Sequence, residues 1–244
     1  MANWSDPRSD IAGFGGATAA RGEAFDAGLR RYMLSVYNYM ASGVLLTGIV
    51  ALLFASSGMA EAVFQGPGIL KYVVMFAPLI FVMVLSFGIN RLSTVAAQGL
   101  FWAYAAVMGV SLSYIFLAYT GTSIAQTFFA TAAAFAGLSL WGYTTKKDLS
   151  GFGTFLIMGV VGLLVASLIN LFLRSNAMSL VISGVGVLLF AGLTAYDTQK
   201  IKNIYAHVAG TDMMDKTVVM GALNLYLDFI NMFLFLLRLF GDRR

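Results

Sequence analysis

Cysteine is absent from the sequence, and His207 is its only histidine. The lack of cysteine excludes disulfides, thiolate metal sites, iron–sulfur clusters and a cysteine nucleophile. A single imidazole without thiolate partners cannot build a usual zinc site. We therefore expect no cofactor.

Charged residues are also scarce, at 11% of 244 residues, while 59% are hydrophobic and the mean hydropathy is +0.83. Soluble domains carry about 25% charged residues. This balance excludes a soluble enzyme, a disordered chain and a nucleic-acid-binding domain as the main interpretation. The net charge of +4 lies in short loops between apolar runs, where it is expected to set topology and not to bind nucleic acid. The sequence predicts an integral membrane protein embedded in a lipid bilayer.

Seven apolar stretches are long enough to cross about 30 Å of hydrocarbon as helices. They are Val36–Ser56, Leu70–Asn90, Val95–Tyr119, Ser123–Tyr143, Phe152–Leu173, Met178–Gln199 and Val218–Leu237. The connections are short, so no further domain is inserted. The predicted fold class is all-α, a seven-transmembrane-helix bundle formed by residues 31–241.

The two ends of the chain are polar. Residues 1–30 are rich in glycine and alanine, mixed in charge and unlike a secretory signal, so we predict a flexible tail, with a segment lying on the membrane surface near Leu29–Tyr39 as the alternative. Residues 242–244 form a short basic end. A cytosolic N-terminus puts ten of the 15 lysines and arginines on the cytosolic side, as the positive-inside rule favours. Arg238, Arg243 and Arg244 oppose this count, and a re-entrant last segment is the alternative that would explain them.

Asp228 is the only charged residue among the twenty of Val218–Leu237, and it lies near their middle. A charge at that depth costs about 2.5–3.5 kcal/mol on insertion scales. Asn224 and Asn231 lie four residues before and three after, so all three share one helix face. We predict that this polar face points into the bundle. A buried acid with a purely structural hydrogen bond is the plainer alternative.

Asp197 lies near the end of the sixth stretch. If the last two stretches form an antiparallel hairpin turning near Thr211–Asp212, the distances of Asp197 and Asp228 from the turn differ by two residues, about 3 Å of rise. Two adjacent carboxylates in low dielectric cannot both ionise easily, so the pair is expected to share a proton. It would act as a latch that closes when one carboxyl is protonated. When both are charged, the oxygens suit a hard cation such as Ca²⁺, bound transiently.

Two other interpretations concern Asp197 itself and the residues near the pair. Asp197 could instead face water or pair with Lys200 at the membrane edge. Arg91 ends the second stretch on the same side of the membrane, so it is a candidate partner of the latch. A basic residue that only sets topology is the equally reasonable alternative for Arg91.

Around the two aspartates the sequence resembles a known family, the Bax inhibitor-1 or transmembrane Bax inhibitor motif family, and it is similar to its bacterial members. The matching segments are Gly192–Lys202 (GLTAYDTQKIK) and Leu223–Arg238 (LNLYLDFINMFLFLLR), and Gly142–Ser150 fits the loop after the fourth helix. The likeness runs from about Arg30 to Gly241.

The resemblance implies a seven-helix bundle whose C-terminal helix is central and wrapped by the other six. It implies residence in a bacterial cytoplasmic (inner) membrane, with the family's aspartyl pair at Asp197 and Asp228 and its basic residue at Arg91. Bacterial relatives are linked to a pH-sensitive Ca²⁺ leak, and others to the regulation of a membrane-anchored ATP-dependent protease.

Three functions compete on this basis. The first is a pH-sensitive Ca²⁺ leak that responds to H⁺ through the aspartate pair. The second is a regulator or inhibitor of a membrane protease complex without transport activity, with residues 1–31 as a ligand. The third, an intramembrane aspartyl protease, is remote, because Leu225-Tyr226-Leu227 precedes Asp228 where those proteases have Gly-x-Gly. Their Pro-Ala-Leu element is missing as well. We therefore expect no enzyme activity.

Overall fold

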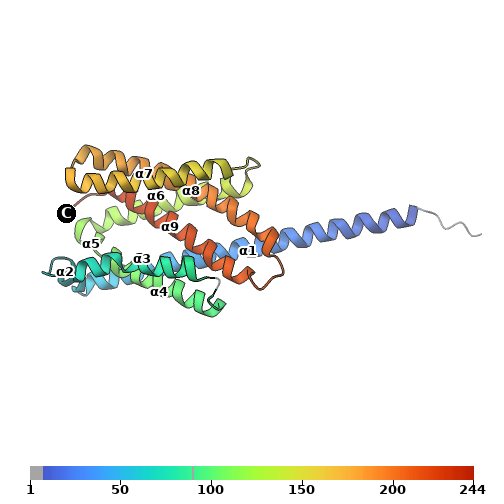
Figure 1. Cartoon of the computed structure of the whole chain (residues 1–244), viewed down its shortest axis with the longest axis horizontal. Helices are drawn as coiled ribbons and strands as arrows, with labels where there is room; N and C mark the ends of the chain where they lie inside the picture. The colour runs from blue at the N-terminus through green and yellow to red at the C-terminus, as the bar shows by residue number, and fades with distance from the viewer. Residues whose placement is uncertain (1–7, 90) are drawn as a thin grey trace, which may run out of the picture.

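The computed structural model describes residues 8–89 and 91–244, with side chains from residue 23 onward. Within these residues the chain is helical, and its only extended pairing is one isolated bridge. The helices are α1 (Arg8–Ser56), α2 (Met59–Phe64), α3 (Leu70–Gly88), α4 (Thr94–Leu112), α5 (Ile115–Ala118), α6 (Gly121–Thr144), α7 (Ser150–Leu173), α8 (Asn176–Val208) and α9 (Met214–Phe240). Figure 1 shows them as one bundle.

Seven of the described helical segments are long and apolar enough to cross a membrane, which confirms the all-α polytopic fold. They are α1 from Glu23, α3, α4 joined with α5, α6, α7, α8 and α9. Polar side chains define several helix starts. The hydroxyl oxygens of Ser93, Thr120 and Ser175 accept hydrogen bonds from backbone N–H groups three residues later, which is the usual N-cap arrangement.

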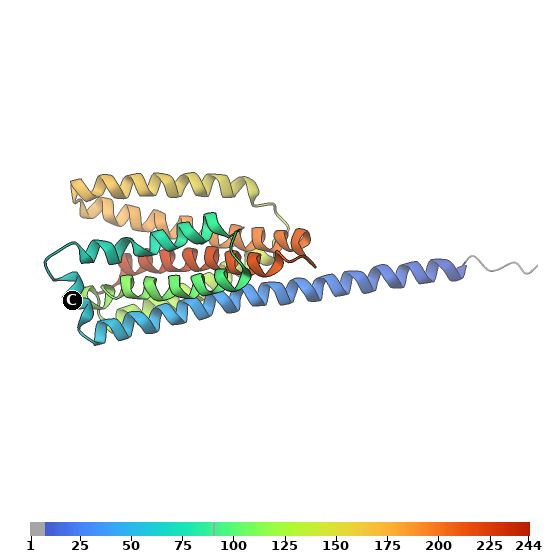
Figure 2. The same ribbon diagram turned by 60° about the horizontal axis from the view of Figure 1, so that its bottom comes forward.

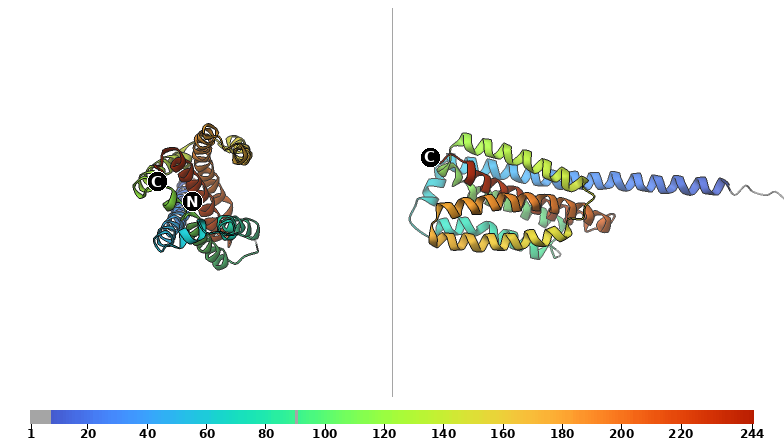
Figure 3. Two further views of the ribbon diagram at one scale, coloured as in Figure 1. Left: turned by 90° about the vertical axis from the view of Figure 1, so that its left-hand side faces the viewer. Right: turned by 90° about the horizontal axis from the view of Figure 1, so that it is seen from above.

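The C-terminal helix α9 forms the centre of the bundle. It packs directly against α8, α1, α6 and α4, and it runs through the middle of the end-on view in Figure 3 (left). The family resemblance implied that all six other spans wrap this helix. In the structure α3 packs mainly on α4, and α7 packs on α8, so both form an outer layer. Their many exposed apolar side chains, such as Phe76 and Phe172, suit contact with lipid.

The first helix is much longer than its membrane span. It extends beyond the rest of the bundle, as Figures 1 and 2 show. Of the predicted flexible tail, residues 1–7 lie outside the described residues, and α1 runs from Arg8 through residue 30 into the span without a break. Packing against α8 begins near Phe25, whose ring centroid lies 5.1 Å from that of Tyr205, and Leu29 is buried. The domain boundary at residue 30 and the mobility of the tail stay predictions.

The last helix crosses the whole bundle. It is continuous over 27 residues, about 40 Å at 1.5 Å per residue. Its C-terminal end lies at the end of the bundle opposite to that from which α1 projects, beside the turn between α7 and α8 (Figure 1). This geometry agrees with seven full crossings and not with a re-entrant last segment. The turn between α8 and α9 spans residues 209–213, as the hairpin arithmetic predicted, with Gly210 at a positive φ of 76° that favours glycine.

Candidate functional site

The structure brings Asp197 of α8 and Asp228 of α9 together. Their carboxyl groups lie within hydrogen-bonding reach of each other. Asp228 is only 4% exposed, whereas Asp197 is partly exposed. The Oδ2 atom of Asp228 is buried, and no N–H or hydroxyl group of the described residues donates a hydrogen bond to it. The pair therefore leaves one buried oxygen that needs a proton from its neighbour or a cation.

Small residues allow the close approach of α6, α8 and α9 around this pair. A Cβ atom at Gly142 of α6 would collide with the backbone of Ala195 on α8. A Cβ atom at Gly221 of α9 would lie 3.3 Å from the side chain of Ile201 on α8. Ile201 follows Asp197 by one turn and Gly221 precedes Asp228 by two, so the antiparallel register of α8 and α9 places the two acids at similar depth.

A set of hydrogen bonds joins α8 to α6 and to the loop that follows it. The hydroxyls of Ser139 and Thr198 lie 3.1 Å apart. The amide of Gln199 donates to the carbonyl of Lys147 and accepts from the N–H of Leu149, both at 2.8 Å. These contacts fix the stretch of α8 that carries Asp197. Sequence reasoning missed Gln199, although it lies inside the quoted motif.

Lys202 anchors the same region from one turn further along α8. Its ammonium group donates to the carbonyl of Tyr143 at 2.7 Å and lies 5.0 Å from the centre of that ring. Lys200 lies over the ring of Tyr196, at 5.9 Å, and forms no salt bridge with Asp197 among the described residues. The alternative in which Lys200 pairs directly with Asp197 is therefore not the arrangement in this structure.

The other predicted site residues do not contact the pair through hydrogen bonds or salt bridges. Arg91 is exposed in the connection between α3 and α4, and within the described residues it has no salt bridge. The amide of Asn231 donates to the carbonyl of Leu227 at 2.9 Å, so its own helix satisfies it. Asn224 is half-buried and forms no side-chain hydrogen bond in the part that the structure describes. The roles assigned to these three residues stay predictions.

Aromatic side chains close the bundle beyond Asp228. The ring of Phe229 lies 5.6 Å from the rings of Phe128 and Phe135, both on α6. On the other side of α9, the hydroxyl of Tyr226 lies 2.6 Å from that of Thr47 on α1, which also donates to the carbonyl of Ala105 on α4 at 2.8 Å. Aromatic and apolar side chains therefore surround this part of α9 on both sides, with one hydrogen bond to α1.

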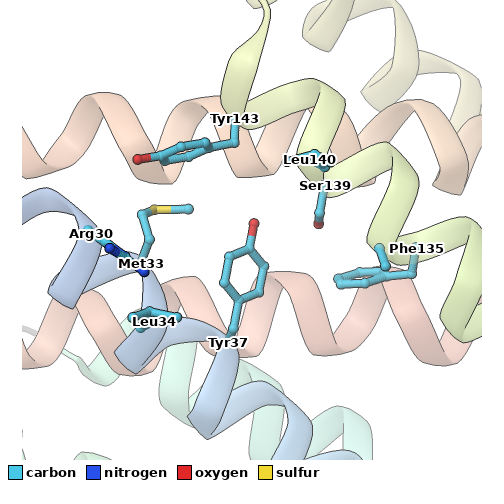
Figure 4. Close-up of a pocket in the computed structure, with 9 residues that line it drawn as sticks. Arg30, Met33, Leu34, Tyr37, Phe135, Ser139, Leu140 and Tyr143 are labelled. Atoms are coloured by element: carbon cyan, nitrogen blue, oxygen red, sulfur yellow. The ribbon is translucent and has the colours of Figure 1, made fainter.

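A cavity of about 460 Å³ opens between α1 and α6 on the side of Ser139. Figure 4 shows the hydroxyl of Tyr37 pointing toward Ser139, with Arg30 and Tyr143 at one end of the cavity. Ser139 lines this cavity and also contacts Thr198, the residue after Asp197. The contact between these two side chains therefore separates the cavity from the segment of α8 that carries the acid.

A more polar cavity of about 500 Å³ lies where α1 meets the ends of α8 and α9. Tyr32, Gln98 and Asp215 are among its lining residues. The hydroxyl of Tyr32 is buried without a hydrogen-bond partner among the described residues. A cavity lined by polar side chains can hold water. Water would enter this cavity at the end of the bundle from which α1 projects.

A cation at the aspartate pair would have few protein ligands. No group of three or more His, Cys, Asp or Glu side chains that could hold a metal ion occurs in the described part of the chain. Ca²⁺ takes six to eight oxygen ligands. Two carboxylates could supply at most four of these oxygens, so water would have to complete the shell and any binding would be weak and transient.

Comparisons with known proteins agree with the membrane fold. The sequence model of the family described as "Inhibitor of apoptosis-promoting Bax1" matches residues 29–244. An uncharacterized protein of Rickettsia prowazekii is 49% identical over 230 residues, covering 93% of this chain and 96% of the relative. The inner membrane protein YbhL of Escherichia coli is 46% identical over 220 residues, covering 89% and 94%. An uncharacterized membrane protein of Streptococcus pyogenes is 40% identical over 218 residues, covering 88% and 94%.

Proposed function

Since this chain belongs to the Bax inhibitor-1 family of membrane proteins, we propose that it is a pH-sensitive Ca²⁺-permeable leak gated by Asp197 and Asp228. One observation carries the proposal. Two carboxyl groups from neighbouring spans face each other inside the protein, and one of their oxygens is buried without a hydrogen-bond donor. Such a pair needs a shared proton or a cation to be stable.

In the closed state one carboxyl is protonated and donates a hydrogen bond to the other. This bond links α8 to α9 at the depth of the pair. Hydrogen bonds to charged groups contribute about 1.5–3 kcal/mol. The two hydrogen bonds between Gln199 and the loop before α7 keep α8 in place, so Asp197 has a fixed position when the pair forms.

Loss of the proton reverses the interaction. Two carboxylates in contact repel each other, and the repulsion is strong because Asp228 is buried in low dielectric. Separation of α8 from α9 would disturb the aromatic contacts of Phe229 with α6 and open the apolar core. The charged oxygens then attract Ca²⁺, which enters through the polar cavity beside Tyr32. Flux is therefore expected to rise with pH.

The test is Ca²⁺ flux into liposomes that contain the purified protein, measured across pH. Asparagine keeps the shape of aspartate, and its amide donates a hydrogen bond at every pH. Asp197→Asn and Asp228→Asn should therefore stay closed, with low flux that no longer depends on pH. Asp212→Asn is the matched control, because Asp212 is exposed in the turn between α8 and α9. If both site variants keep the pH dependence of the wild type, the gating mechanism is wrong.

For the cell we propose the bacterial inner membrane, with the N-terminus in the cytosol. Support comes from the inner membrane assignment in the name of the YbhL relative and from the ten lysines and arginines on the side of the bundle where α1 begins. Labelling of a single cysteine introduced at Ala209, in the turn between α8 and α9, with a membrane-impermeant reagent tests this orientation. Labelling in intact cells would contradict it.

One observation favours a second function, the regulation of a membrane-anchored protease. The part of α1 before Phe25 extends beyond the bundle, where a partner could contact it (Figure 2). Deletion of residues 1–22 should then abolish co-purification with a protease complex and leave the flux of the bundle unchanged. Retained co-purification would remove the support that α1 gives to this function. The family and the names of the relatives describe a membrane protein and give no enzyme class.

A further inference from the structure

Three arginines converge on a single pocket at the end of the bundle opposite to the projecting part of α1. The pocket has a volume of about 880 Å³ and includes Arg174, Arg238 and Arg243 in its lining. No carboxylate lines it, and none of the three guanidinium groups forms a salt bridge with a carboxylate among the described residues. Three unneutralised positive charges around one pocket favour an anion.

The turn between α7 and α8 holds Arg174 in an unusual conformation. Its φ is 51°, the left-handed region that favours glycine at the end of a helix. The side chain of Asn170 braces the turn by accepting from the N–H of Ser175 at 3.0 Å and donating to the hydroxyl of Ser179 at 2.7 Å. A glycine would fit this backbone more easily, so the arginine side chain needs another reason to be there.

The C-terminal segment is fixed in a similar way. The carbonyl of Asp242 accepts from the N–H of Thr120 at 3.0 Å, and the N–H of Arg244 donates to the carbonyl of Ala118 at 3.1 Å. This short extended strap makes neighbouring side chains point in opposite directions. Arg243 lines the pocket, whereas Arg244 does not.

The rim of the same pocket is apolar. Leu171, Phe172 and Leu180 line it and are well exposed, as expected of side chains in contact with lipid chains. A soluble anion would need only the arginines, whereas a phospholipid brings a phosphate and an acyl chain together. On the cytoplasmic side of membranes, basic pockets between transmembrane helices bind the headgroups of anionic lipids, and the same charge attraction is available to this pocket at the other end of the bundle.

We propose that this pocket binds an anionic phospholipid. Arg174, Arg238 and Arg243 contact its phosphate, and the apolar rim contacts its acyl chain. The site also explains why basic residues gather at the end of the bundle where the positive-inside count disfavours them. It is remote from the aspartate pair and does not depend on the Ca²⁺ leak.

The test uses the purified full-length protein in detergent micelles and a fluorescent short-chain phosphatidylglycerol, with binding followed by anisotropy. Each arginine near a phosphate contributes about a fivefold gain in affinity. Arg243→Gln should weaken binding about fivefold, and Arg244→Gln, the matched control on the same strap, by less than about twofold. Equal losses in the two variants would overturn the proposal, because they would reflect general charge and not the pocket.

A second variant separates binding from folding. Arg174→Gly relieves the left-handed backbone, so its unfolding temperature should equal or exceed that of the wild type while its affinity for phosphatidylglycerol falls about fivefold. Unchanged affinity would contradict a role for Arg174. Competition identifies the chemistry of the occupant. Displacement of the probe by inorganic phosphate as readily as by unlabelled phosphatidylglycerol would show a free-anion site, and equal displacement by phosphatidylcholine would show that charge is irrelevant. Either result would overturn the assignment to an anionic lipid.

Discussion

Gly142→Ala should separate α6 from α8 next to the aspartate pair. A Cβ atom there would collide with the carbonyl oxygen of Ala195 and lie 2.9 Å from its carbonyl carbon, both backbone atoms that no rotamer can move. Ordinary contacts begin at 3.4 Å, so the helices must separate by at least about 0.5 Å. Overpacking of this kind costs about 1–3 kcal/mol. Because alanine has a higher helix propensity than glycine, the substitution also stabilises the helix by about 0.8–1 kcal/mol, which offsets part of this cost.

Gly137→Ala is the matched control on the same helix, because a Cβ atom at Gly137 would meet nothing within 4 Å. The propensity gain is common to both variants. The difference in their free energies of unfolding should therefore equal the overpacking term, about 1–3 kcal/mol. Unfolding in mixed micelles, followed by circular dichroism, measures this difference. If Gly142→Ala is as stable as Gly137→Ala, the tight contact between α6 and α8 does not exist as described.

Two further changes test other contacts. Tyr226→Phe removes the hydrogen bond to Thr47 and should lower the free energy of unfolding by about 0.6–1.7 kcal/mol, whereas Tyr104→Phe, whose hydroxyl has no hydrogen bond among the described residues, should change it less. In the loop before α7, hydrogen bonds from Ser150 hold the pKa of Asp148 below its usual value, so this acid stabilises the fold at neutral pH and loses that effect as pH falls through its folded pKa. Asp148→Asn should therefore lower the unfolding temperature more at pH 7 than at a pH below the usual range of an aspartate, and an equal decrease at both pH values would contradict the argument.

Much of the fold could be predicted from the sequence because membrane spans are a local property of composition. The seven predicted stretches correspond to the seven membrane-length segments. Helix ends were less predictable. The sixth apolar stretch ends at Gln199, whereas α8 continues to Val208, since a helix satisfies its own backbone hydrogen bonds in water as well as in lipid. The division of the third span into α4 and α5 had no evident signal in the sequence.

The aspartate pair was predictable for a related reason. Two acids at similar distances from one turn must come to similar depth, and α8 and α9 turn where the hairpin arithmetic placed the turn. The sequence could not show how each helix is rotated about its axis. For that reason the hydrogen bonds of Gln199 and Lys202, which depend on which residues face α6, could not be predicted.

The central claim is that Asp197 and Asp228 hold one proton between them when the protein is closed. Infrared spectroscopy measures this directly through the C=O stretch of a protonated carboxyl in the purified protein, titrated across pH. We expect one such band in the closed state, its loss as pH rises in parallel with the increase in Ca²⁺ flux, and its absence in Asp228→Asn. A spectrum without a protonated carboxyl at any pH where flux is low, or a band that survives in both Asp197→Asn and Asp228→Asn, would contradict the account.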